Sequence, residues 1–322
     1  MRNKQRAESK EQRAKLRYDI LLLLCSLIPA ICSFACKSVP KIMEQLPSES
    51  GIVPLDKGAS AYVIIDVAGA RPILEGISYL PMADKNMKQM LDRTQSAAMA
   101  VFMPSSEETR RFQLVTWGSY PASGSSIAFG ANKDWVRLRS LFPRSDYWYS
   151  EAAQMSVVVK PKLAYVLATM TKAPRNPMAS SDGIKIPDGF FEFAGGSSLS
   201  CWLPDPGAIL KKTLNDMGIP LEFPAEQLFI CLFPEEGQKY TAQIKIKFKF
   251  IGQARILTNL LFLARRNFTP PPKVAASAQD GAAMLPSLLF ANPAVQDNNT
   301  VFLKLPPLSA NDISLLFSLF SL

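Results

Sequence analysis

The 322-residue chain contains no histidine. This absence excludes enzymes that activate serine or cysteine through histidine, and it removes the common imidazole general base and most zinc sites. One Ser-x-x-Lys match, Ser38 to Lys41, lies in a segment without sustained periodicity, where nothing would exclude water. The acidic pairs at 107–108 and 235–236 lie in predicted turns and are expected to be solvated. The sequence therefore predicts a protein that is not an enzyme and that uses no metal ion or cofactor.

Glycine is also scarce, with 16 residues in the chain. Three of them, Gly118, Gly124 and Gly130, are spaced by six, which matches neither a phosphate-binding loop nor a dinucleotide-binding fingerprint. The sequence contains no loop of alternating Asp or Asn that would indicate a calcium site. These absences exclude the commonest nucleotide and calcium sites.

The most informative stretch of the chain is its start. Seven Lys or Arg residues precede position 18, and an uncharged run of 17 residues follows at 20–36. The apolar core of a signal peptide has about 7–15 residues and a membrane span about 20, so this run falls between the two. Pro29 weakens a continuous helix inside the run, which suits the end of a signal peptide.

The end of this run resembles the lipobox of bacterial lipoproteins, in which signal peptidase cuts before a cysteine that carries lipid. Ala35 immediately precedes Cys36, whereas Ser33 and Phe34 depart from the usual pattern and resemble the relaxed boxes of spirochaete lipoproteins. The resemblance covers about the first 36 residues. It implies a signal peptide at 1–35, acylation of Cys36, and a lipid-anchored protein outside the cytoplasm, on the cell membrane or outer membrane. The alternatives are an uncleaved N-terminal helical anchor, ordinary secretion and a buried helix.

The basic character of the chain comes partly from this segment. The whole chain has a formal net charge of +9, but residues 1–35 hold seven basic and three acidic side chains, so the remainder has a net charge of +5. Nucleic-acid binding usually needs clustered Lys and Arg on one face, so no nucleic-acid partner is expected. The partners expected are the membrane, through the lipid anchor, and another protein of the envelope; attraction to anionic lipid also remains open.

Proline and serine divide the rest of the chain. Residues 36–59 are expected to form a tether that holds the folded part off the membrane. A second interruption at 173–190 predicts a linker between two domains of ordinary size, at 60–172 and 191–322.

The two predicted domains resemble each other weakly. Apolar strands at 62–66 and 201–205 each end in an Asp suited to capping a helix. At 240–250, apolar residues alternate with Thr, Gln and Lys, which predicts an antiparallel strand with one buried face. Helices are expected at 132–141 and 253–265. The pattern predicts an α+β fold of two weakly repeated βαββαβ-like units, with antiparallel sheets covered by helices on one face.

Two groups of side chains are candidates for binding. Lys245, Lys247 and Lys249 are expected to share one face of a strand, either as a solvated face or as a contact for lipid headgroups or an acidic partner. The segment around 135–149 interleaves aromatic residues with arginine, which indicates either a groove for sugars or peptides or ordinary core packing. Its candidate binding residues are Trp135, Arg137, Arg139 and Trp148.

Only two cysteines, Cys201 and Cys231, would remain besides Cys36 after removal of the signal. In an oxidising compartment they could form a disulfide, but both lie in apolar runs that resemble buried strands, where a free thiol packs as a small apolar group. The C-terminal segment 311–322 is apolar on most of its circumference. It is expected to dock on the sheet as the last helix or, if exposed, to contact a partner or membrane.

These observations together predict a non-enzymatic, membrane-anchored extracytoplasmic lipoprotein with a binding or structural role in the cell envelope. The alternative is a lipoprotein that recognises a small molecule, a sugar or a peptide, through the segment at 135–149 or between the two units.

Overall fold

The computed structural model describes residues 55–76, 88, 91–102, 111–119, 129–130, 133–140, 145–152, 155–160, 165–169, 184, 186–207, 224–267 and 286–319. The predicted signal peptide and most of the predicted tether, with Cys36, lie outside these residues. Within them, no helix is long and apolar enough to cross a membrane.

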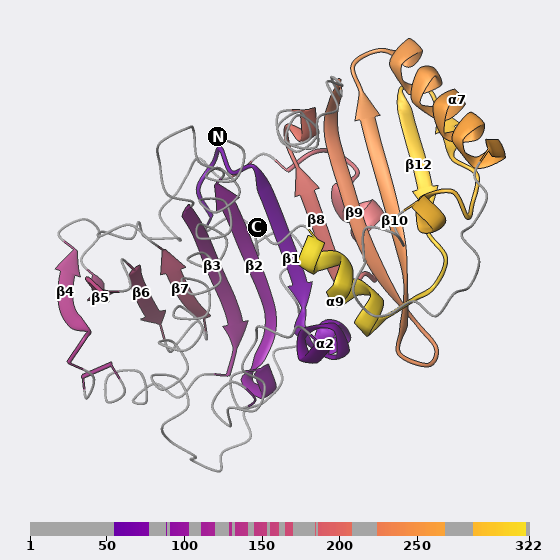
Figure 1. The fold of residues 1–322 in the computed structure, drawn as a ribbon. Helices are drawn as coiled ribbons and strands as arrows, with labels where there is room; N and C mark the ends of the chain where they lie inside the picture. The colour runs from indigo at the N-terminus through magenta and orange to yellow at the C-terminus, as the bar shows by residue number, and fades with distance from the viewer. Residues whose placement is uncertain are drawn as a thin grey trace, which may run out of the picture.

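One antiparallel sheet of thirteen strands organises the described part of the chain (Figure 1). The strands of its first half run outward from β1 to β4 in the order β1 (Ala61–Asp66), β2 (Thr94–Phe102), β3 (Arg111–Gly118), β7 (Tyr165–Thr169), β6 (Met155–Lys160), β5 (Ser145–Ser150) and β4 (Val136–Ser140). The second half runs outward as β8 (Leu199–Leu203), β9 (Ala225–Glu235), β10 (Lys239–Phe248), β12 (Thr300–Lys304) and β11 (Val295–Asp297), and β13 (Leu308–Ser309) pairs with β10.

The two halves of the sheet join between β1 and β8. These strands pair antiparallel, with Tyr62 opposite Trp202 and Ile65 opposite Leu199. The prediction of an α+β fold with antiparallel sheets is confirmed, and the two expected units share one continuous sheet. The internal repeat and the domain boundaries stay predictions.

Helices lie on both faces of the sheet, but unequally. We call the two sides the helix face and the α5 face. On the helix face lie α2 (Val67–Gly76), α7 (Ile251–Asn267) and α9 (Ala310–Leu319), and on the other lies the short α5 (Phe190–Ala194). Ile244 of β10 packs in both apolar clusters of the helix face, one with α2 and α9 and one with α7. Alternate residues of the same strand therefore place all three longer helices on one side.

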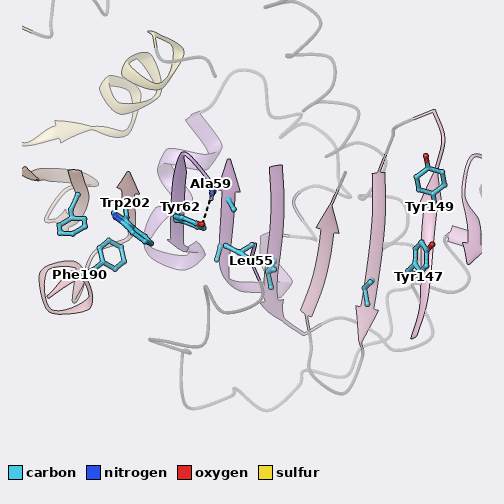
Figure 2. Close-up of a cluster of buried hydrophobic side chains, with 12 residues drawn as sticks. Leu55, Ala59, Tyr62, Tyr147, Tyr149, Phe190 and Trp202 are labelled. Carbon is cyan, nitrogen blue, oxygen red and sulfur yellow. Dashed lines mark hydrogen bonds between the residues drawn. The ribbon is translucent and has the colours of Figure 1, made fainter. Parts of the chain in front are cut away.

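The α5 face has a largely aromatic core (Figure 2). Tyr62 stacks on Trp202 with ring centroids 5.0 Å apart, and Phe190 of α5 lies 5.3 Å from the ring of Phe229. The Tyr62 hydroxyl donates to the carbonyl of Asp56 and accepts from the amide of Ala59. These contacts fix the segment that precedes β1 against the sheet.

The strand predicted at 240–250 is confirmed as β10, but it ends at Phe248. The pairing with β9 shifts register between Lys247 and Phe248, which interrupts the alternation. Helix α7 then begins at Ile251, and the Gln253 side chain accepts a hydrogen bond from the Phe250 amide. This helix confirms the one expected at 253–265.

The helix expected at 132–141 is wrong, because residues 136–140 form strand β4. Val136, Arg137, Leu138 and Arg139 alternate apolar and charged side chains, and this period of two fits a strand rather than a helix. The cross-strand pairing with β5 is regular from Val136 to Ser140. The alternation of these four residues therefore indicates the observed strand better than the position in the expected repeat does.

The C-terminal helix docks on the helix face, as one of the two alternatives predicted. Ile313 of α9 is 3% exposed and packs with Ile73 of α2. Ser309 and Asp312 form a reciprocal cap: the amide and hydroxyl of Ser309 donate to the Asp312 carboxylate, and the Asp312 amide donates to the Ser309 hydroxyl. The cap satisfies amides that the first turn of a helix otherwise leaves without a partner.

Candidate functional site

The three predicted lysines lie in three different environments. Lys245 and Lys247 share the α5 face of β10, opposite Phe302 and Thr300 respectively, and Lys249 lies beyond the end of the strand. Lys247 and Lys249 are exposed, whereas Lys245 is half-buried. The sheet therefore presents two of the three side chains on one face, and only one of those two is fully solvated.

An aromatic box surrounds the ammonium group of Lys245. Its Nζ lies 5.6 Å from the ring centroid of Phe193, 5.7 Å from that of Phe229 and 5.7 Å from that of Phe302. Cation–π contacts of this kind each contribute about 0.5–1 kcal/mol at exposed sites and more when desolvated. No carboxylate of the described residues forms an ion pair with Lys245. The rings therefore take the place of a counter-ion.

The two predicted tryptophans both pack on the ring of Phe129. Phe129 is fully buried between them: its centroid is 4.8 Å from that of Trp135, edge to face, and 5.5 Å from that of Trp148, stacked. Trp135 is 5% exposed. The structure thus brings the aromatic residues of this segment together as packing, which was one of the two alternatives predicted.

The arginines of the same segment point outward. Arg137 lies opposite Trp148 in the register of β4 and β5, and it forms an exposed ion pair with Asp146. Arg139 is exposed, and no carboxylate of the described residues pairs with it. The edge strand therefore presents a basic face next to a packed aromatic cluster.

The two cysteines are free and face opposite sides of the sheet. Cys201 lies opposite Ile230 and Cys231 lies opposite Ser200, so the thiols of these adjacent strands point away from each other. Burial raises the pKa of Cys201 to about 12 and that of Cys231 to about 11. Both groups are therefore protonated, unreactive thiols at neutral pH, and the structure does not bring them together as a disulfide.

Helix α7 presents an apolar surface that the sequence analysis did not identify. Its inner face packs Ala254, which is fully buried, together with Leu257 and Leu261. A second set of large apolar side chains remains exposed at 50–62%: Ile251, Ile256, Leu260, Phe262 and Leu263. We call Ile256, Leu260 and Leu263 the outer stripe, because the i, i+4, i+7 spacing aligns them on one side of the helix.

The charge on α7 has one sign. The helix carries Arg255, Arg265 and Arg266, all exposed, and no acidic residue. The sequence of α7 contains two sets of apolar residues with helical spacing, one on the inner side and one on the outer side. A helix expected at 253–265 with a single buried face accounts for only the first set.

Possible metal ligands do not cluster among the described residues. These residues hold no cluster of three or more cysteine, aspartate or glutamate side chains that could bind a metal ion. A shallow hollow at the β9–β10 turn is lined by Glu235, Glu236 and Lys239 between two prolines. Glu235 accepts a hydrogen bond from the Thr241 hydroxyl, so it serves the hairpin rather than a ligand.

Comparisons with known proteins agree on one family. A family model described as outer membrane-associated lipoprotein TP0453 matches residues 51–264. The fold is similar to crystal forms IV, III and I of TP0453, with TM-scores of 0.57, 0.56 and 0.56 and sequence identities of 18%, 16% and 18%. Each alignment covers 84% of this chain and 96%, 97% and 98% of the respective TP0453 chain. No curated protein matches the chain.

Proposed function

Because the chain belongs to the TP0453 family of outer membrane-associated lipoproteins, we propose that it is a non-enzymatic, lipid-anchored envelope protein that also docks on the membrane through α7. The observation that carries this proposal is the outer stripe of Ile256, Leu260 and Leu263, which the fold leaves exposed at 61%, 54% and 50%. An exposed apolar surface of this kind on a folded protein indicates a contact with a partner or membrane.

The chemistry of α7 favours a lipid surface. The three arginines of the helix can approach lipid phosphates while the outer stripe enters the boundary between headgroups and acyl chains. Full burial of a Leu or Ile side chain contributes about 1.5–3 kcal/mol, so the half-exposed residues of the stripe would each add about 1 kcal/mol. Each arginine near an anionic surface adds about 1 kcal/mol. These sums describe weak, reversible docking.

A covalent anchor would make such weak docking effective. Acylation of Cys36 would hold the folded part at the membrane and raise the local concentration of lipid near α7. Several acyl chains anchor a protein essentially irreversibly, since each buried CH₂ contributes about 0.8 kcal/mol. In this proposal the anchor determines where the protein lies, and α7 determines which side faces the lipid.

Depth-dependent quenching tests the docking. A Leu260→Trp variant of the acylated protein, reconstituted into vesicles that contain brominated phosphatidylcholine and an anionic lipid, is expected to show more quenching than the parent. Val295→Trp is the matched control, because Val295 is 59% exposed on edge strand β11, outside α7. Equal quenching at positions 260 and 295 would reject α7 as the docking surface.

Mass analysis tests the anchor separately. The intact mass of the membrane-bound protein should lack residues 1–35 and include a lipid increment, and a Cys36→Ala variant should show neither change. A parent mass that retains residues 1–35 without added lipid would eliminate the anchor and leave the quenching result to be judged by itself.

A further inference from the structure

In the described part of the chain, the sheet ends on the side away from α7 in a strand whose outer edge has no partner strand. Strand β4 is the terminal strand of the order and, among the described residues, pairs only with β5 (Figure 1). The outward backbone amides and carbonyls of an edge strand are a template for pairing with another extended segment.

The edge lacks several of the usual devices that prevent pairing. β4 contains no proline, and its five residues, Val136–Ser140, stay in regular register with β5 without a bulge. The opposite end of the sheet differs, because β11 has only three residues. Very short strands, prolines, bulges and charged side chains are the common protections of edge strands. β4 has none of the first three, so the charges of Arg137 and Arg139 are what restricts the segments that can pair with it.

The two faces of β4 have different chemistry. Arg137 and Arg139 lie on one face, and Val136 and Leu138 lie on the other, opposite Tyr149 and Tyr147 of β5. Val136 is 55% exposed. Asp146 of β5 lies opposite Arg139 in the register but forms its ion pair with Arg137, and Arg139 has no ion-pair partner among the described residues. A strand added to β4 would meet a net positive row on one face and an apolar row on the other.

Charge argues against a second copy of the chain as the added strand. Antiparallel pairing of two β4 strands centred on Leu138 would place Arg137 of each copy directly opposite Arg139 of the other. Like charges directly opposite each other on a sheet face are destabilising, whereas opposite charges are stabilising. The arginines thus disfavour self-pairing and favour an acidic strand.

We propose that β4 is a docking edge for an extended acidic segment of another protein, which adds a strand to the sheet. The backbone of the segment pairs with the open edge. Its Asp or Glu residues at alternate positions face Arg137 and Arg139, and the intervening apolar residues cover Val136 and Leu138. Main-chain pairing gives such complexes affinity, and the alternating side chains give them specificity.

A pair of designed peptides tests the proposal on the full acylated protein in detergent. A peptide of alternating Glu and Val is expected to bind, and one of alternating Lys and Val to bind roughly fivefold more weakly, because the charge pair with Arg139 changes sign while Arg137 is already paired with Asp146. Arg139→Glu should narrow or reverse this preference. Lys304→Glu is the matched control, an exposed charge reversal on β12 in the other half of the sheet, and it should leave the preference unchanged.

Backbone methylation separates strand addition from simple charge attraction. In an extended peptide, the amides of alternate residues point to the same edge. Two Glu–Val peptides, each N-methylated on the amides of one edge, should therefore differ in affinity, and the peptide methylated on the edge that pairs with β4 should lose most of its binding. Equal binding of both methylated peptides would overturn the proposal, as would an unchanged preference in Arg139→Glu with an unaltered melting temperature. Self-association of the parent chain that Arg139→Glu strengthens would assign the edge to a second copy instead.

Discussion

Lys245 Nζ lies 5.6 Å from the ring centroid of Phe193, and this contact joins β10 to α5 across the α5 face. Phe229 and Phe302 complete the box at 5.7 Å each. The ammonium group therefore connects α5, β9 and β12 with one side chain.

We expect Lys245→Gln to lower the free energy of unfolding by about 1 kcal/mol, because the substitution removes the cation–π contacts with three rings. Lys247→Gln, on the same face but exposed, should change it by less than about 0.5 kcal/mol. Urea unfolding of both variants measures the difference. Equal losses would show that the box contributes no stability beyond that of a surface lysine.

The sequence could predict the strand that carries Lys245 but not its partners. The alternation at 240–250 identified β10 and the face of its lysines, because a strand repeats every two residues. Phe193 and Phe302 are 52 and 57 positions away in the chain, and only the fold brings them to the same side. A lysine in an alternating pattern therefore looks solvated whether or not distant rings surround it.

The error at 132–141 has a different cause. The helix is expected there only because the other unit has one at the corresponding place, although Val136 to Arg139 alternate with the period of a strand. The local pattern is the stronger signal, because apolar and charged side chains that alternate along the chain indicate a strand directly, whereas the weak internal repeat indicates a helix only by analogy. The outer stripe of α7 was missed for a related reason: exposure depends on which side of a helix the sheet covers, and periodicity alone does not fix that.

Substitution by alanine at two glycines should change the stability of the protein in opposite directions. A Cβ added at Gly118, at the end of β3, would lie 2.0 Å from the backbone carbonyl oxygen of Arg93, whereas one at Gly252 in α7 would meet nothing within 4 Å. Gly118→Ala should therefore destabilise the protein by about 3 kcal/mol, since backbone must move. Gly252→Ala should stabilise it by about 0.5 kcal/mol through helix propensity. Thermal unfolding of the pair checks both signs.

The cap of α9 should control how often the C-terminal helix opens. Asp312→Ala removes the two hydrogen bonds that its carboxylate accepts from Ser309, and loss of such a cap costs about 1 kcal/mol. We expect limited proteolysis near the C-terminus to accelerate roughly fivefold in this variant. Asn311→Ala, an exposed neighbour in the same turn, is the control. Unchanged cleavage in Asp312→Ala would show that packing of Ile313 alone holds the helix.

The two free thiols, Cys231 buried and Cys201 partly buried, predict a loss of stability in alkaline solution. Burial raises the pKa of Cys201 to about 12 and of Cys231 to about 11, against an ordinary value of 9.0. As the pH rises above about 9, the unfolded chain loses these protons while the folded chain keeps them, so the free energy of unfolding falls. Each such proton changes it by about 1.4 kcal/mol per pH unit. Below pH 8 the thiols contribute no pH dependence.

A double variant separates the thiols from the tyrosines that titrate in the same range. Burial also raises the pKa of Tyr62 and Tyr240, which adds a decline of the same sign. Cys201→Ala combined with Cys231→Ala should therefore flatten, but not abolish, the fall between pH 9 and pH 11 in denaturant titrations. At pH 8, a thiol reagent should modify the folded parent at the same rate as the double variant, because Cys201 and Cys231 do not react. Denaturant should expose these two thiols and make the parent react faster. Rapid modification of folded parent at these two positions would contradict the burial on which the prediction rests.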